Sequence, residues 1–214
     1  IVSGSDITVS LGTSSTATEG TDYGTVSDIT IRAGATTGTT TFTPTDDSMY
    51  ETSTNETAII SIDGVSGGSA AENGTPQAVT ITITENESAP TVTLTTSATS
   101  IAENAGSSLT LTATLSGTTS QDVTVSLSSS SSATEGTDYG TVSDITITSG
   151  STTGTVSFTP TDDSLYDAAS NETAIIAISG VSGGGATESG TQTVTITIVD
   201  NESAPTVTLS TSAT

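Results

Sequence analysis

The chain has 214 residues, and 24 of them are Asp or Glu against a single basic residue, Arg32, so the formal net charge is −23. It has no histidine, cysteine or lysine, which excludes the usual general bases, thiol nucleophiles and Schiff-base lysines, as well as the usual zinc and iron–sulfur ligands. The acidic balance argues against nucleic-acid binding and against anionic membranes, and no apolar run is long enough to span a bilayer. We expect no enzyme, no nucleic-acid partner and no membrane insertion in this segment.

Segments that alternate apolar with hydroxyl-bearing residues recur along the chain, at 78–84, 108–115, 122–127 and 193–199. Alternation of this kind in β-branched residues, bounded by Gly, Ser, Asn and Asp, is typical of strands with one buried face. No helical period of useful length is present. The pattern predicts an all-β chain of short strands and frequent turns, and hence a sandwich or a barrel.

The sequence also repeats itself. "ATEGTDYGTVSDITI" at 17–31 returns unchanged at 133–147, an offset of 116 residues, and after Pro76 the offset becomes 115. A further copy begins near the C-terminus, where "SAPTVTL" at 203–209 repeats 88–94. Units of this size predict tandem domains rather than a solenoid.

We therefore divide the chain into an N-terminally truncated repeat (1–88), a complete repeat (89–204) and the first strand of a further repeat (205–214). This division indicates a window from a longer tandem array. The strand at 205–214 could instead complete the sheet of a neighbouring subunit by strand addition. We favour the window.

Carboxylates are concentrated in two matching phrases, "TPTDDSMYETSTNE" at 43–56 and "TPTDDSLYDAASNE" at 159–172, with no basic residue nearby. The loops of a sandwich gather at its two ends, so such residues can meet at one tip. Crowded carboxylates without counter-charge call for a hard cation, and Ca²⁺ takes six to eight oxygen ligands. The alternative is that these aspartates are solvated turn residues.

Four motifs of the complete repeat, "IAENAG", "EGTDY", "DDSLY" and "TITIVDNE", resemble the Calx-beta domain. This is the calcium-binding module of sodium–calcium exchangers and is also common in very large bacterial surface proteins. The resemblance covers the complete repeat and most of the truncated one. It implies tandem Ig-like, seven-stranded antiparallel β-sandwiches with calcium at one tip, next to the following domain.

The resemblance also implies the ligands. In the complete repeat they are Glu103, Asp138, Asp162, Asp163, Asp167, Glu172, Asp200 and Glu202, with Asn201 close by. In the truncated copy they are Asp22, Asp46, Asp47, Glu51, Glu56, Glu85 and Glu87. The truncated copy lacks a counterpart of Glu103, and Asn interrupts the closing acidic run of both copies, which leaves the number of ions open.

Aromatic residues accompany these loops. We expect Phe42 and Phe158 in the core. We expect the tyrosines to pack at the bases of the acidic loops, and they are Tyr23, Tyr50, Tyr139 and Tyr166. None is assigned to ligand stacking.

These observations predict a calcium-rigidified structural repeat of a large extracellular bacterial adhesin or surface filament, with neighbouring repeats as its partners. Two alternatives stay open. One is a glycan- or protein-binding module of a surface protein, although the loops at the opposite tip lack aromatic residues. The other is a calcium-sensing regulatory domain.

Overall fold

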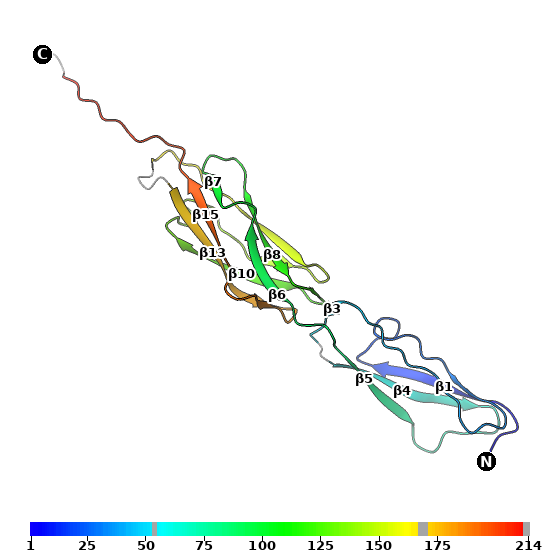
Figure 1. Ribbon diagram of the computed structural model, residues 1–214. Helices are drawn as coiled ribbons and strands as arrows, with labels where there is room; N and C mark the ends of the chain where they lie inside the picture. The colour runs from blue at the N-terminus through cyan, green and yellow to red at the C-terminus, as the bar shows by residue number, and fades with distance from the viewer. Residues whose placement is uncertain (53–54, 167–170, 212–214) are drawn as a thin grey trace. The chain divides into compact units, whose positions relative to one another are not determined.

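The computed structural model describes residues 1–52, 55–166 and 171–211, and the chain forms two compact units (Figure 1). The first unit comprises Ile1–Ser48 and Ser53–Asn86, and the second comprises Met49–Thr52 and Glu87–Thr214. All regular structure in the described ranges is β-strand, as the sequence predicts. The described residues include no helix that could cross a membrane.

The first unit is built on one antiparallel sheet. Its strands, in spatial order, are β2 (Ile29–Ile31), β1 (Ile7–Ser15), β4 (Asn55–Ser66) and β5 (Ala78–Thr84). The strand predicted at 78–84 is confirmed as β5.

The core of the first unit is small and open on one side. Tyr23 is buried and stacks on Phe42 with ring centroids 4.8 Å apart, but Phe42 itself is only half-buried. Phe42 and Val79 also line an open cavity of about 410 Å³ over the apolar face of the sheet. The side chain of Val79 is 62% exposed. One layer of this unit is therefore incomplete.

The second unit is a sandwich of two main sheets. The first sheet holds β11 (Ile145–Ile147), β10 (Val123–Ser131), β13 (Asn171–Ser182), β15 (Thr193–Val199) and β7 (Ser100–Ala102). The second sheet holds β12 (Thr153–Phe158), β8 (Leu109–Leu115), β6 (Thr91–Thr96) and β14 (Thr187–Glu188). A short parallel pair, β3 (Met49–Tyr50) with β9 (Thr118–Thr119), completes the unit.

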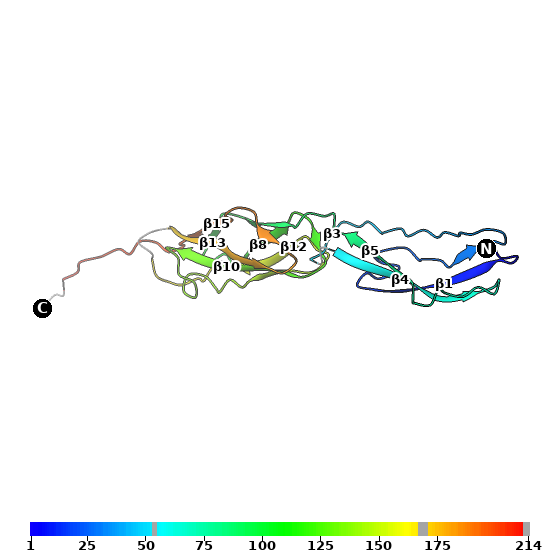
Figure 2. The ribbon, with the colours of Figure 1, turned by 90° about the horizontal axis from the view of Figure 1, so that it is seen from below.

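The two sheets of the second unit pack against each other (Figure 2). Strand β6 contacts β13 and β15 across the interface, and β8 contacts β11. The alternation predicted for 108–115 is confirmed, because Leu109, Leu111, Ala113 and Leu115 are all buried. The sandwich expected from the sequence is thus the observed fold.

Two stacked aromatic residues lie in this core. Phe158 and Tyr139 are fully buried and stack with centroids 4.8 Å apart. Burying a side chain of this size stabilises the fold by about 1.5–3 kcal/mol. Phe158 lies in the core as expected. Tyr139 and Tyr23 are buried and bridge to Pro160 and Pro44, just before the paired aspartates, as expected for the bases of the acidic loops. The expectation does not hold for Tyr166, which is 39% exposed, and Tyr50 lies instead in β3 of the second unit.

Candidate metal centre

Three strand ends of the second unit's first sheet meet at one edge. Strands β7 and β15 run parallel with Ala102 opposite Val199, and the Glu103 amide donates a hydrogen bond to the Val199 carbonyl at 3.0 Å. Strand β13 runs antiparallel to β15, with Asn171 opposite Val199. The residues that follow β7 and β15, and those that begin β13, therefore emerge together.

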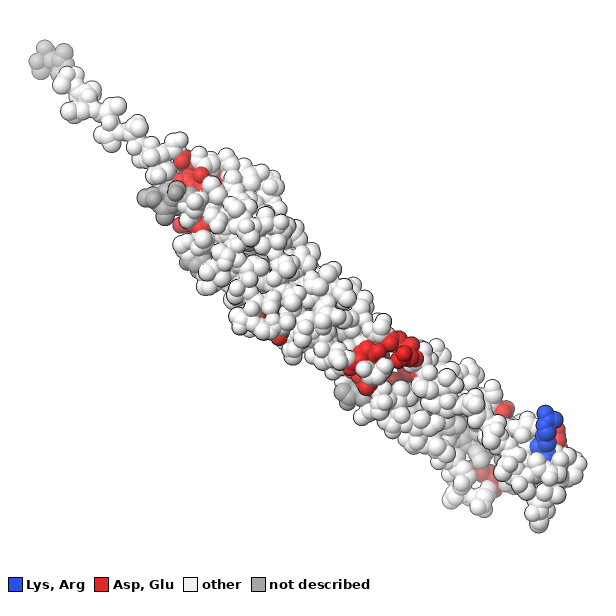
Figure 3. Space-filling view, viewed as in Figure 1, with Lys and Arg blue, Asp and Glu red and all other residues white. Residues whose placement is uncertain are grey.

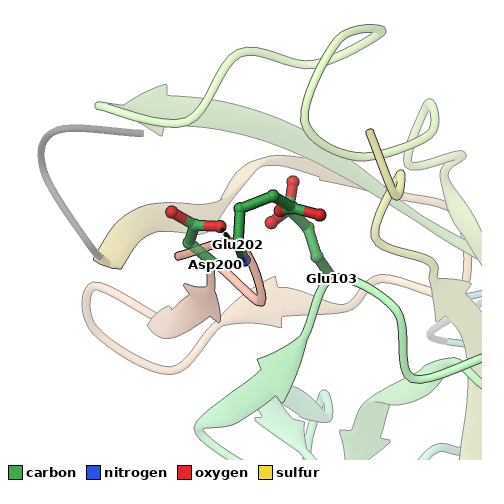
Figure 4. A group of neighbouring side chains, drawn as sticks. All are labelled: Glu103, Asp200 and Glu202. Atoms are coloured by element: carbon green, nitrogen blue, oxygen red, sulfur yellow. Dashed lines mark hydrogen bonds between the residues drawn. The ribbon is translucent and has the colours of Figure 1, made fainter. Parts of the chain in front are cut away.

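Glu103, Asp200 and Glu202 form the acidic cluster at this edge (Figure 4). Each offers a carboxylate oxygen, and these atoms all lie within 4.8 Å of one another. Glu103 is only 7% exposed, and the other two are half-buried. The loop is held by the Glu202 amide, which donates to Asp200 Oδ1 at 2.7 Å. No basic residue of the sequence lies beyond Arg32, so nothing in this unit offsets the charge.

Glu202 is surrounded by other carboxylates and is partly buried. Its Oε2 atom is buried and has no hydrogen-bond partner among the described residues. Partial burial, its hydrogen bond with Asp200, and the carboxylates of Asp200, Asp162 and Asp163 all raise the pKa of Glu202 above its ordinary value of 4.5. A buried oxygen without a partner is unfavourable. An all-oxygen donor set that includes such an atom fits a hard cation such as Ca²⁺.

The paired aspartates lie beside this cluster. Asp162 and Glu103 line the same small, open cavity, whose volume is about 190 Å³. Asp163 Oδ1 accepts a hydrogen bond from the Leu165 amide at 2.6 Å, which shapes the loop. Both aspartates are exposed, and their negative charges help to raise the pKa of Glu202. Their role as further ligands stays a prediction.

Among the described residues, the structure does not bring the remaining predicted ligands of the complete repeat into the acidic cluster. The Asp138 carbonyl accepts from the Thr161 amide at 2.9 Å, which joins the two loops, but its carboxylate accepts from the Thr134 amide at 2.5 Å within its own loop. Glu172 lies in β13 opposite Ile198. Asp167 lies outside the described residues. Their role as ligands stays a prediction.

Asn201 lies near the cluster as expected, and it is a hydrogen-bond donor to one of the cluster carboxylates. Its side-chain amide donates to Glu202 Oε1 at 3.0 Å. The amide nitrogen thus supports one carboxylate of the cluster. This role could not be read from the sequence, because it depends on how the loop after β15 folds back.

The matching residues of the truncated copy fall in both units. Asp22, Asp46, Asp47, Glu56 and Glu85 lie in the first unit, whereas Glu51 and Glu87 lie in the second. Within the first unit, Asp46 Oδ1 accepts from the Asn86 side chain at 3.0 Å, which brings the loop of the acid pair to the end of β5. In the part of the chain that the structure describes, only Glu103, Asp200 and Glu202 gather three carboxylates closely. A second calcium site stays a prediction.

The Calx-beta domain family matches residues 3–87 and again residues 85–202. The chain belongs to the Calx-beta family. The resemblance predicted from the motifs is confirmed, and the chain holds two Calx-beta domains in tandem. Calcium, the cofactor expected from the residues, agrees with this family and with the acidic cluster.

Several solved structures resemble this Calx-beta tandem. The apo form of the Calx CBD1 domain is 17% identical, covers 54% of this chain and all of its own, and superposes with a TM-score of 0.45. CBD12 from CALX1.2 is 14% identical over 91% of this chain and 88% of its own, with a TM-score of 0.40. The calcium binding domain CBD12 of CALX1.1 is 13% identical over 92% and 88%, with a TM-score of 0.37. No curated protein matches the chain.

Proposed function

We propose that this Calx-beta tandem is a calcium-rigidified structural segment of a large extracellular adhesin or surface filament. The observation that carries the proposal is the position of the acidic cluster. It lies at the end of β15, directly before Ser203–Pro205, where the sequence passes into a further copy of the repeat. In Figure 3 Asp and Glu gather in compact groups, and one group lies where the C-terminal trace leaves the second unit.

The physical mechanism follows from charge. Without a cation, the cluster carboxylates repel one another and the loops after β7 and β15 are pushed apart. A bound Ca²⁺ supplies the missing positive charge, and Glu103, Asp200 and Glu202 would hold it together with Asp162 and Asp163. This ties the loop after β15 to the body of the domain. Pro205 restricts its own backbone and biases Ala204 towards extended geometry, which further stiffens the joint.

The composition suits an extracellular setting. Extracellular calcium modules have dissociation constants of about 10⁻⁴–10⁻³ M, so millimolar calcium keeps them filled. A net charge of −23 also keeps long molecules soluble and apart. Immunolabelling of intact source cells tests this location: labelling without permeabilisation is expected, and labelling that requires it contradicts the extracellular role.

Thermal unfolding of the full chain, with about 10 mM calcium and then with excess chelator, tests the metal centre. For dissociation constants in the extracellular range, calcium should stabilise the second unit by about 1.4–2.7 kcal/mol. The double variant Glu103→Gln with Asp200→Asn should lose this gain. Asp144→Asn is the matched control, because Asp144 bonds Ser126 and Leu127 away from the cluster.

Hydrogen exchange locates the response. Calcium should slow exchange in the residues around Glu103 and around Asp200, and small-angle scattering should show a narrower spread of chain dimensions. An unchanged melting curve and unchanged exchange would overturn calcium binding. Slower exchange with identical scattering profiles would leave binding intact but overturn the stiffening.

A further inference from the structure

One segment lies in a different unit from the one its sequence predicts. Met49–Thr52 belongs to the acidic phrase of the first repeat, yet it lies within the second unit. Met49 and Tyr50 pair in parallel with Thr118 and Thr119. The Ser120 amide donates to the Tyr50 carbonyl at 3.0 Å, and the Gln121 side chain donates to Thr52 Oγ1 at 2.9 Å.

The Tyr50 ring occupies the space above Gly185. A Cβ atom at Gly185 would lie 2.5 Å from Tyr50 Cε1, closer than real Cβ contacts allow, and 3.2 Å from its hydroxyl oxygen, which is also tight. Gly185 has a positive φ of 62°, but this alone does not require glycine here. The matching residue of the first repeat is Ser69, and it adopts a φ of 54°. The missing side chain at Gly185 therefore makes room for the tyrosine.

We call the surface formed by Thr118–Gln121, Gly150 and Gly185 the tyrosine notch. Thr119 at its floor is fully buried, and a Cβ atom at Gly150 would lie 3.9 Å from Met49 Cε. The notch thus combines backbone hydrogen bonds with one glycine position, Gly185, that makes room for the tyrosine ring, while Met49 is in ordinary contact range of Gly150. Its occupant is an apolar residue followed by tyrosine.

The second repeat carries a matching pair, with Leu in place of Met, at the same place. Leu165 and Tyr166 follow Met49 and Tyr50 by 116 residues. Leu165 is 67% exposed and Tyr166 is 39% exposed, whereas Met49 and Tyr50 are partly buried in the notch. The matching pairs therefore differ in exposure: the one in the notch is partly buried, and the other is exposed.

We propose that each repeat of the array docks its Met/Leu–Tyr pair into the tyrosine notch of the repeat that follows. The partner of the exposed Leu165–Tyr166 pair is thus another copy of this repeat. A glycine at the position of Gly185 determines whether a repeat accepts the tyrosine, and a serine, as at Ser69, excludes it. The hydrogen bonds named above and the ring contact of the notch use no carboxylate, although the predicted ligand Glu51 lies between Tyr50 and Thr52, so docking is measured separately from calcium binding.

Cysteine cross-linking in the full chain tests this docking, because the protein has no native cysteine. Paired residues of neighbouring strands lie about 4.8 Å apart, within the Cα range of about 4.4–6.8 Å for disulfides. Met49→Cys with Thr118→Cys should cross-link rapidly within one chain. Leu165→Cys with Thr118→Cys is the matched control and should not. The rates are measured in calcium and in chelator, so that a failure of calcium binding is seen separately.

Adding Gly185→Ser to the Met49/Thr118 cysteine pair should slow cross-linking by about tenfold or more. Tyr50→Ala, which leaves the notch itself intact, should do the same, and Tyr166→Ala should have no effect. The proposal is overturned if the Met49/Thr118 pair cross-links no faster than the Leu165/Thr118 pair. It is equally overturned if Gly185→Ser and Tyr50→Ala both leave the rate unchanged.

Discussion

At the scale of single residues, the acidic cluster holds carboxylates whose negative charge no basic side chain of the same unit neutralises. Glu103 is nearly buried, and Glu202 has a buried oxygen without a partner among the described residues. A carboxylate in this setting must hold its proton, move into water or bind a cation. The acidic cluster is therefore the part of the domain whose stability depends most on pH and on metal.

Glu202→Gln separates these possibilities. Because the folded pKa of Glu202 lies above 4.5, the folded state binds the proton more tightly than the unfolded state does. That contribution to stability is present below pH 4.5 and is lost as the pH rises through the raised pKa. In chelator, the wild type should therefore lose stability relative to Glu202→Gln as the pH increases, and urea midpoints at several pH values measure this.

With calcium the order should reverse near pH 7, because the glutamine gives up a charged ligand. Asp144→Asn again serves as the control outside the cluster. Parallel stability curves for the wild type and Glu202→Gln across the whole pH range in chelator would contradict the raised pKa of Glu202 in the folded state.

At the scale of elements, matching segments of the two repeats form a strand in one unit and none in the other. Gly154–Phe158 lies in β12 and pairs with β8, whereas the matching residues 38–42 form no strand. The strand β8 has no counterpart in the first unit, so the backbone groups of residues 38–42 lack a ladder to join. Strand formation here depends on the neighbour rather than on local propensity.

The edge of the sandwich gives a test at this scale. A Cβ atom at Gly154 would lie 2.5 Å from the Thr146 carbonyl oxygen and 2.8 Å from Ile145 Cγ2, because β12 and β11 of opposite sheets approach closely there. Gly154→Ala should cost about 1–3 kcal/mol in the free energy of unfolding, measured by urea denaturation. Gly117→Ala, where a Cβ atom meets nothing within 4 Å, should change it by less than about 0.5 kcal/mol. Equal effects would contradict this close approach.

At the scale of the whole molecule, the two units differ in how much apolar surface they bury. The buried cluster of the first unit consists of Ala17, Tyr23 and Ala58 among the described residues. That of the second unit includes the inward faces of both sheets. Since apolar burial is the dominant stabilising term, the two units should not unfold together.

Hydrogen exchange measures this difference. The amides of β1 and β4 in the first unit should exchange at least about tenfold faster than those of β10 and β13 in the second. The two strand pairs can be compared directly within one chain. The register of β1 with β4 is the same as that of β10 with β13, shifted by 116 residues. Equal protection of the two pairs would show that the open face of the first unit does not limit its stability.

The sequence by itself determined the repeats, the chemistry of the loops and the strands with a clear alternation of apolar and polar residues. Alternation predicted β8 and β15 because a strand has a period of two, and the clustered carboxylates predicted an oxygen-rich cation site. The motifs likewise predicted the Calx-beta family. These features are local, so a single stretch of residues carries them.

Only the tertiary structure decided which of these features come together. "TVTL" is the buried strand β6 at 91–94, yet at 206–209 it is exposed and unpaired, with Val207 97% and Leu209 99% exposed. Of the eight carboxylates predicted as ligands in the complete repeat, the strand order β13-β15-β7 brings Glu103 next to Asp200 and Glu202. Tyr50 and Tyr166 occupy matching positions in similar sequences but have different neighbours. The physical reason is that strands, clusters and docked side chains need partners distant in the chain, and local sequence does not specify those partners.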